Sequence, residues 1–224
     1  MKTIQLLIKS LIGTLFFLLM LFISAGRINY WQGWLYATIC IISVLLNSFA
    51  LKNKDEIAAE RSGVKSGTKS WDKRILGLST VTLIITYIVT GLDSGRFQWS
   101  PSFHWSINTI GAILILLGEV IFLMAQKQNK FFSSLMRIQT DRGHTVCDTG
   151  IYKIIRHPAY FGNIITATGI PLILGSLWGF IPSVVSIFLI LIRTSLEDKT
   201  LIKELDGYRD YTYKTQYRLL PYIW

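Results

Sequence analysis

The sequence predicts an all-α, polytopic integral membrane helical bundle of about six spans. Three observations indicate this fold class. First, 51% of the 224 residues are hydrophobic, only 16% are charged, and the mean hydropathy is +0.43, which is too little charge for an ordinary soluble domain. Second, the apolar residues gather in runs long enough to cross a bilayer. Third, the polar segments between these runs alternate in their content of Lys and Arg.

Four apolar runs in the first part of the chain predict membrane-spanning helices. They cover residues 4–25, 34–51, 75–92 and about 106–125. Each approaches or reaches the roughly 20 residues that a helix needs to cross a bilayer. Lys2 and Lys9 give the first run some likeness to a signal peptide, but the run is long and further spans follow. We therefore interpret it as an uncleaved first helix.

The apolar region 161–192 is too long for a single span of ordinary tilt. Gly175, Gly179 and Pro182 interrupt it, which predicts a tight hairpin of two helices. The two glycines also form a GxxxG pattern, which at this position we interpret as a turn rather than as a dimerisation face. Five spans with a re-entrant hairpin are the alternative to six.

The tail 194–224 is polar and amphipathic. We expect it to be helical as far as Leu205, with Gly207 ending the helix.

Lys and Arg are distributed unevenly over the polar segments. The segments 52–74 and 126–159 hold seven and six of them, whereas the loops after the first and third spans hold one each and the hairpin turn holds none. The positive-inside rule then places both of these basic segments, the tail and both termini on the cytosolic side. In a bacterium the membrane would be the cytoplasmic one.

The net charge of +10 raises the question of a nucleic-acid partner. The basic residues are not clustered with stacking aromatics as such binding requires, so we expect no nucleic-acid partner. They lie in the loops between the apolar spans, where they face membrane lipids. The two cysteines, Cys40 and Cys147, have no metal-ligand spacing, so we expect free thiols and no metal. GxGxxG, P-loop and HExxH motifs are absent from the sequence.

The polar stretch 143–160 contains two of the three histidines and ends in Arg156-His157-Pro158-Ala159-Tyr160. A proline biases the residue before it towards an extended conformation, and its missing N–H costs little in the first turn of a helix. We therefore expect His157 to lie just before the N-terminus of a membrane-entering helix. Free N–H groups and the positive end of the helix dipole favour an anion there.

This stretch resembles the isoprenylcysteine carboxyl methyltransferase family and, more loosely, the related phospholipid N-methyltransferases. The family pattern is a Gly-x-Tyr, an Arg-His-Pro-x-Tyr, a hydrophobic hairpin, then an Arg and an acidic pair. In this sequence these elements are Gly150-Ile151-Tyr152, residues 156–160, the apolar region 161–192, Arg193, and Glu197-Asp198. The resemblance covers the C-terminal part well and the first half only as a pattern of spans.

The resemblance implies an enzyme that uses S-adenosyl-L-methionine, with its cofactor site on the cytosolic side of the membrane. It divides the chain into residues 1–125, with four N-terminal spans, and residues 126–224, the catalytic region. The acceptor would be a lipophilic small molecule or a prenylated substrate entering from the bilayer. Carboxyl O-methylation of an isoprenylcysteine-like or other lipophilic carboxylate is the leading chemistry, and lipid amine N-methylation is the second.

Two alternatives come from other classes. Membrane sterol reductases, which use NADPH, carry a similar Arg-His-Pro-x-Tyr segment, so an NADPH-dependent membrane reductase is one alternative. A non-catalytic membrane scaffold is the other. Six spans rather than more, and a short tail without a dinucleotide motif, disfavour the reductase. Charged residues spaced as in the family site disfavour the scaffold.

The resemblance also implies roles for particular residues. Cofactor-binding positions are Gln139, His144, Thr145, Val146, Cys147, Tyr152, His157, Pro158, Ala159, Tyr160 and Glu197. Arg193 would lie near the substrate, and Arg193 and Glu197 would be the catalytic residues. Cys147 departs from the usual aliphatic residue, the spacing from Gln139 to His144 is short, and Asp198 stands where a glutamate is commoner.

Simpler structural explanations exist for several of these residues. His157 could be only a helix cap, and Arg193 could be a snorkelling side chain that pairs with Glu197 four residues later on the same helix face. We expect this Arg193–Glu197 pair in either case. Glu119, inside the fourth apolar run, could line the pocket or reach the membrane interface, and the sequence does not separate the two.

Overall fold

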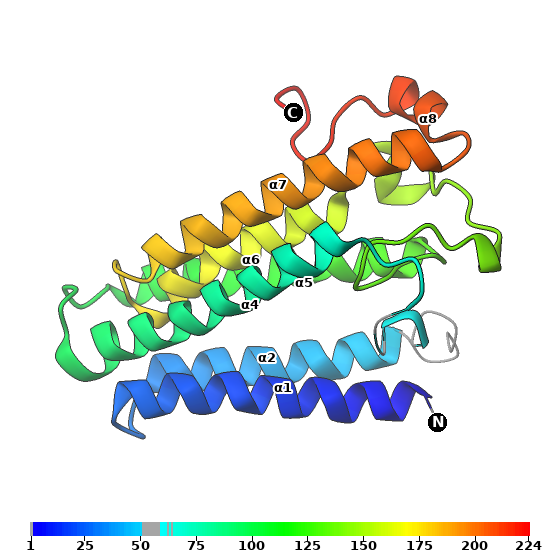
Figure 1. The fold of residues 1–224 in the computed structure, drawn as a ribbon. Coiled ribbons are helices and arrows are strands. Elements are labelled where there is room, and N and C mark those ends of the chain that lie inside the picture. Colours follow the sequence, from blue (N-terminus) through cyan, green and yellow to red (C-terminus); the bar gives the residue numbers. More distant parts are fainter. Residues whose placement is uncertain (1, 51–58, 62, 64) are drawn as a thin grey trace.

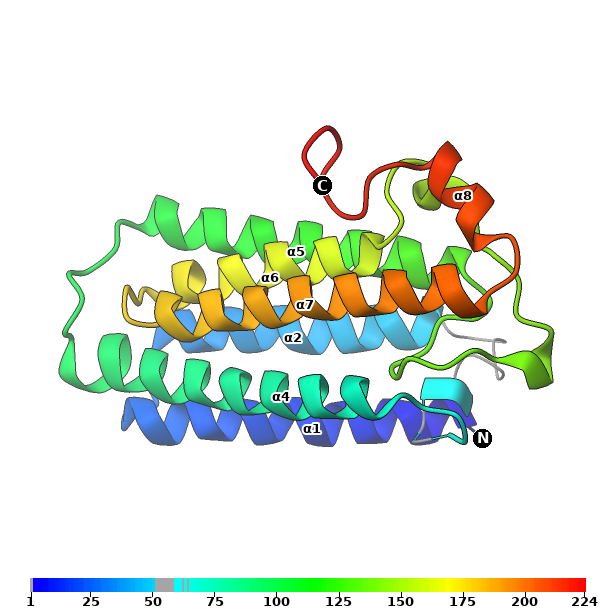
Figure 2. The ribbon, with the colours of Figure 1, turned by 45° about the horizontal axis from the view of Figure 1, so that its top comes forward.

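The computed structural model describes residues 2–50, 59–61, 63 and 65–224, and over these residues it is all-helical, without strands. Long helices lie side by side along one common direction (Figures 1 and 2). Their bounds are α1 Lys2–Ala25, α2 Trp31–Ala50, α4 Ser70–Thr90, α5 Trp105–Gln128, α6 Pro158–Leu174 and α7 Phe180–Glu204. The shorter elements are the π-helical turn η1 Gly91–Phe97, the 3₁₀ turns η2 Thr140–Arg142 and η3 Gly150–Lys153, and α8 Tyr208–Lys214. The predicted all-α class is confirmed.

Five of these helices, α1, α2, α4, α5 and α7, are long and apolar enough to cross a membrane. Their outward faces carry large exposed hydrophobic side chains, such as Ile12 and Ile23 on α1, as expected of helices that face lipid. The sixth helix, α6, has 17 residues and spans about 26 Å, slightly less than the roughly 30 Å hydrocarbon core. The six-span and five-span hypotheses differ in whether α6 crosses completely, and six spans stays a prediction.

The hairpin expected in the apolar region 161–192 is present as α6 and α7. Gly175 ends α6 in the left-handed conformation, with φ +71°, and its N–H bonds to the carbonyls of the last turn. The GxxxG pattern is therefore a turn, as predicted. The buried carboxylate of Asp93 fixes this turn by accepting bonds from the Ser176 and Ser100 hydroxyls at 2.5 and 2.6 Å.

Helices α5 and α6 approach unusually closely because glycines face each other. A Cβ on Gly118 would lie 2.5 Å from the carbonyl oxygen of Gly162, and a Cβ on Gly162 would lie 2.5 Å from that of Gly118. Small residues at such positions let two membrane helices pack backbone to backbone. This contact holds the first turns of α6, which follow His157, against the second half of α5.

The polar segments gather at one end of the bundle, on the right in Figures 1 and 2. This end holds the stretch between α5 and α6, the residues just before α4, and α8 with the tail. The described parts of these segments therefore share one end of the bundle, and their common placement on the cytosolic side of the membrane stays a prediction. The long helix α7 ends at Glu204, one residue before the expected end, and Gly207, with φ +78°, is the N-cap of α8.

Candidate active site

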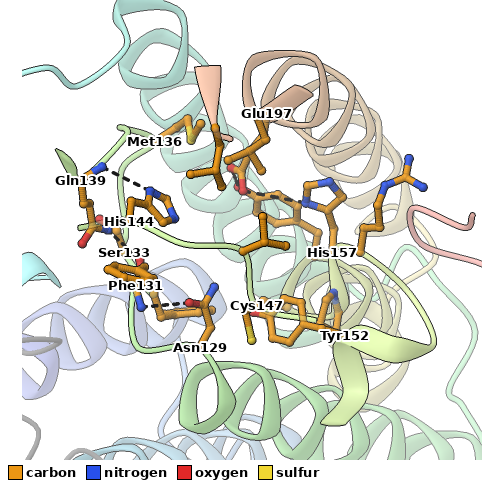
Figure 3. A pocket seen from close by; sticks show the side chains of 18 of the residues that line it. Asn129, Phe131, Ser133, Met136, Gln139, His144, Cys147, Tyr152, His157 and Glu197 are labelled. Carbon is orange, nitrogen blue, oxygen red and sulfur yellow. Dashed lines mark hydrogen bonds and ion pairs between the residues drawn. The ribbon is translucent and has the colours of Figure 1, made fainter. Parts of the chain in front are cut away.

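A pocket of about 290 Å³ lies at the polar end of the bundle, between the ends of α5 and α7 and the start of α6 (Figure 3). The stretch 129–160 and α8 complete its walls. The pocket brings together all twelve residues that the sequence indicated: Gln139, His144, Thr145, Val146, Cys147, Tyr152, His157, Pro158, Ala159, Tyr160, Arg193 and Glu197.

His157 occupies the N-cap position of α6, and Pro158 follows at the first helical position, as the sequence predicted. Its side chain makes no capping hydrogen bond, so capping does not explain this histidine. The buried ring lies instead between two acids of α7, with Nε2 3.1 Å from Asp198 Oδ1 and Nδ1 3.8 Å from Glu197 Oε1. Since a carboxylate only accepts, Nε2 carries the proton in this bond.

Asp198 is fully buried and connects the start of α6, α7 and the tail. Its carboxylate accepts bonds from Arg156 Nε and Nη2 at 2.8 and 2.9 Å and from Arg218 Nε at 2.8 Å. The Tyr208 hydroxyl donates a further bond at 3.0 Å. A glutamate is commoner than an aspartate at this position of the family pattern, yet Asp198 joins three parts of the chain beside the pocket. Removing a partner from such a buried ion pair leaves an uncompensated charge.

Glu197 faces the pocket, and Figure 3 shows it and His157 pointing towards each other. Its Oε2 accepts a bond of 2.5 Å from the hydroxyl of Tyr160, and its side chain keeps 21% of its surface exposed. In the part of the chain that the structure describes, Oε1 accepts no hydrogen bond. This oxygen is therefore available to a cationic ligand group.

Arg193 does not pair with Glu197, so the expected partner is wrong. Its guanidinium binds Asp72 on α4 in a bidentate way, with Nε–Oδ1 2.7 Å and Nη2–Oδ2 3.2 Å. Helices α4 and α7 pack side by side, and this long-range contact places a fully buried acid opposite the guanidinium. The same guanidinium lies 5.1 Å from the centre of the Tyr160 ring, a cation–π contact that turns it towards the pocket.

Asp72 is the residue that the sequence analysis missed. Its carboxylate also accepts the backbone N–H of Met136 at 2.7 Å, so it ties the pocket wall to α4. The sequence contained one signal for it: Asp72 is a single acidic residue among Lys69, Lys73 and Arg74, at the start of a predicted span.

Gln139 and His144, which are close in the sequence, form a turn that two hydrogen bonds close. The His144 N–H bonds to the Gln139 carbonyl at 3.2 Å, and the Gln139 N–H bonds back to His144 Nδ1 at 3.2 Å. The Gln139 side chain donates to the Phe131 carbonyl at 2.7 Å, so it braces the wall of the pocket. Burial, helped by two neighbouring arginines, lowers the pKa of His144 to about 4, which keeps its ring neutral at pH 7.

Tyr152 and Cys147 lie on the opposite wall. The Tyr152 hydroxyl donates to the Ala125 carbonyl at 3.4 Å, and the Tyr152 carbonyl accepts from the Tyr211 hydroxyl at 2.6 Å. The Cys147 thiol lies 3.7 Å from the Gln128 carbonyl, and burial raises its pKa, so it remains a neutral thiol.

Fold and site together define a polytopic membrane protein that has, at one end of the bundle, a pocket lined by ionisable side chains. Residues 107–206 match the family model of the phospholipid methyltransferases. This matched segment is 100 of the 224 residues and resembles that family.

Individual relatives are similar over part of the chain. Protein-S-isoprenylcysteine O-methyltransferases B and A of Arabidopsis thaliana are 34% and 33% identical over 67 residues, which are 30% of this chain and 34% of each relative. A probable protein-S-isoprenylcysteine O-methyltransferase of Oryza sativa subsp. indica is 31% identical over 67 residues, 30% of this chain and 35% of the relative. The matched segment thus spans about a third of these relatives' length.

The fold is that of a solved structure, the eukaryotic intramembrane Ras methyltransferase, isoprenylcysteine carboxyl methyltransferase. The TM-score is 0.62 at 19% sequence identity, over 92% of this chain and 74% of the other.

Proposed function

We propose that this protein is an S-adenosylmethionine-dependent membrane methyltransferase that esterifies a lipophilic carboxylate, isoprenylcysteine-like or of another kind. The observation that carries the proposal is the arrangement on α7. Glu197 and Arg193, four residues apart, line the same pocket at the N-terminus of α6, so one carboxyl group and one guanidinium group face a shared space. The names of the relatives support the same chemistry.

The residues present fit the cofactor. Glu197 offers a carboxylate oxygen without a hydrogen bond among the described residues, which suits an ammonium group. Ala159 lies in the first turn of α6, where backbone N–H groups lack intrahelical partners and favour a carboxylate. Phe131, Tyr152 and Tyr211 give the pocket an aromatic lining that suits an adenine ring.

When bound, S-adenosylmethionine supplies an electrophilic methyl group on a sulfonium sulfur. A carboxylate acceptor is already ionised at neutral pH, so no residue has to act as a strong base. The task of the protein is then to position the acceptor. Arg193 is suited to this because Asp72 fixes its Nε and Nη2 while Nη1 makes no hydrogen bond within the described part of the chain.

His157 and Tyr160 act as positioning residues in this proposal. The Tyr160 hydroxyl holds one oxygen of Glu197, and the His157 ring separates Glu197 from Asp198. The two acids therefore take different roles: Glu197 faces the ligand, and Asp198 joins the chain segments.

Lipid amine N-methylation is the second candidate, because the matching family model is that of the phospholipid methyltransferases. An ammonium acceptor would have to lose a proton first, and the Arg193 guanidinium would repel it.

A panel of acceptors tests the proposal. The purified protein, in detergent, is incubated with labelled S-adenosylmethionine and with prenylated thiol carboxylates, fatty acids and lipid amines. We expect transfer to carboxylates that reach the pocket from the bilayer. Transfer only to amines would establish the second candidate, and binding of NADPH without binding of S-adenosylmethionine would point to a reductase.

A further inference from the structure

The tail that follows α8 turns back along the bundle. Helix α8 lies at the polar end, whereas the mark C lies outside the helices and level with the first part of α6 in both views (Figures 1 and 2). Helix α6 is apolar, and membrane helices run roughly along the membrane normal, so its first turns lie at the membrane boundary. A segment beside them is therefore at the depth of the lipid. We call residues 219–224 the tail loop.

Hydrogen bonds close the tail loop into a compact turn. The main-chain oxygen of Trp224 accepts the N–H groups of Arg218, Leu219 and Leu220 at 2.9, 3.0 and 3.2 Å. The Trp224 N–H returns to the Leu220 carbonyl at 3.1 Å. The loop therefore holds one shape, and its outward side chains form a fixed surface.

The outward surface of the tail loop is apolar and aromatic. Tyr222 and Ile223 keep 90% and 77% of their surface exposed, and Leu220 is exposed as well. The Tyr222 ring packs against Tyr217, with 5.2 Å between the ring centres. Tyrosine is enriched where a membrane meets water, because its ring is apolar and its hydroxyl reaches the headgroups. The composition of the loop is thus that of a membrane-interface segment.

The chain next to the tail loop has the same character. Ile154, shortly before α6, is 60% exposed, and the exposed Lys153 precedes it. Two residues after Ile154, the Arg156 N–H bonds to the Tyr217 carbonyl of the tail, so this segment and the tail lie together. Exposed apolar side chains that gather in this way mark contacts with proteins or membranes. A lysine beside them suits the headgroup boundary.

The tail between α8 and the tail loop is bonded to the candidate active site. The N–H groups of Arg156 and His157 donate to the carbonyls of Tyr217 and Arg218, both at 2.9 Å. Arg218 Nε also binds the buried Asp198 at 2.8 Å. Whatever holds the tail loop in place therefore also holds the main chain at the start of α6.

We propose that the tail loop is a membrane anchor: Leu220, Tyr222 and Ile223 insert between lipid headgroups and acyl chains, and this contact stabilises the bonds from the tail to Arg156 and His157. The partner is the lipid surface. Lipid is favoured over a protein partner because the loop lies beside the membrane helices, where lipid surrounds the bundle. The inference goes beyond the proposed function and holds for any reaction at the site.

Brominated lipids test the position of the tail loop. In a background without Cys40 and Cys147, Ile223→Cys carries a bimane fluorophore, and Thr140→Cys at the polar end carries it as the control. Both positions are exposed. The proteins are placed in nanodiscs of phosphatidylcholine with or without brominated acyl chains. Bromine should quench the label at 223 at least threefold more than the label at 140, and aqueous iodide should quench in the reverse order.

Two other outcomes of this measurement would overturn the inference. A label at 223 that iodide quenches and brominated lipid does not would place the tail loop in water. A label that neither quencher reaches would place a protein, such as a second copy of the chain, on the loop.

Hydrogen exchange tests the link to the site in nanodiscs of the same lipid, without substrate or cofactor. Ile223→Asp should speed exchange of the Arg156 and His157 amides roughly tenfold, because a carboxylate disfavours insertion of the loop. Ile223→Leu, which keeps the apolar surface, should exchange like wild type. So should Tyr213→Asp, which adds the same charge at an exposed position of α8.

Unchanged exchange in Ile223→Asp, or equal acceleration in Tyr213→Asp, would overturn the inference. Melting curves identify a variant that has not folded, and the brominated-lipid measurement at 223 then decides. Neither measurement depends on methyl transfer, so a failure of the proposed function would leave both results standing.

Discussion

Arg193 of α7 and Asp72 of α4 form a bidentate ion pair, with Nε–Oδ1 2.7 Å and Nη2–Oδ2 3.2 Å. Asp72 also holds the backbone of Met136, so one buried carboxylate joins two helices to the wall of the pocket. Asp72 thus holds in place the arginine that the family resemblance places near the substrate. The effects expected of substitutions at Arg193 therefore depend on its two bonds to Asp72.

Arg193→Lys should lower turnover roughly tenfold or more, because an ammonium group keeps the charge but cannot make two parallel bonds to Asp72. Arg193→Ala should nearly abolish turnover and leave cofactor affinity within about twofold. Single-turnover rates and calorimetry separate these effects. A lysine variant with wild-type turnover would mean that Arg193 is only an anchor at the membrane edge.

Asp72→Ala should destabilise the fold by about 3–5 kcal/mol, because it leaves the guanidinium of Arg193 buried without its partner. Thermal unfolding in detergent measures this loss. Asp148→Ala, at an exposed aspartate, is the control and should melt like wild type. Equal melting temperatures for Asp72→Ala and the control would show that the ion pair contributes nothing to stability.

Tyr160→Phe should weaken S-adenosylmethionine binding by about tenfold, because the phenol holds one oxygen of Glu197 at 2.5 Å and hydrogen bonds to charged groups contribute about 1.5–3 kcal/mol. His157→Ala should weaken it as well, since the imidazole separates the two acids. Isothermal calorimetry gives the affinities, and Tyr213→Phe, at an exposed tyrosine on α8, is the control. Unchanged affinity in both site variants, together with tight binding of NADPH, would favour the reductase.

Stability should decrease as the pH falls from about 6.5 to 4, in part because of His144. Its pKa is about 4 in the folded protein, against about 6.5 for an imidazole in the unfolded chain. Between these values the unfolded chain binds more protons, so the contribution is fully present above pH 6.5 and is lost towards pH 4. We expect about 1–2 kcal/mol after allowing for solvent screening.

Melting curves of wild type and His144→Gln between pH 4 and 7 test this. The difference in melting temperature between the two proteins should depend on pH. A pH-independent difference at His144 would contradict the assignment of a neutral, buried ring.

Single cysteines test the topology. In a background without Cys40 and Cys147, Thr140→Cys at the polar end and Ser102→Cys in the loop before α5 should react with an impermeant reagent from opposite sides of sealed vesicles. Both positions are exposed. Labelling from the same side would contradict the six-span arrangement and the cytosolic placement of the pocket.

The sequence predicted those features that depend on local chemistry. Pro158 placed His157 at a helix start, and Gly175 ended α6 in the left-handed conformation that a glycine permits. Each of these follows from one or two neighbouring residues. The position of the pocket lining followed from the family resemblance, which joins residues that are distant in the chain.

The contacts between distant helices could not be predicted in this way. The pair Arg193–Asp72 joins residues 121 apart, whereas helical spacing alone favoured Glu197 as the partner. The close approach of Gly118 and Gly162 likewise depends on which helix faces which. Asp198 was undervalued because a family pattern favours glutamate there, while its four-way network is visible only in three dimensions.

The most direct test of the proposed function is the chemical nature of the methylated product. Wild-type protein is incubated with methyl-labelled S-adenosylmethionine and N-acetyl-S-farnesylcysteine, and the extracted product is treated with mild base. A methyl ester releases its label as volatile methanol, whereas an N-methylated lipid amine does not. We predict transfer to the carboxylate probe with complete release of the label by base. A base-stable product formed on lipid amines, or the absence of any transfer by folded, cofactor-binding protein, would contradict carboxyl methylation.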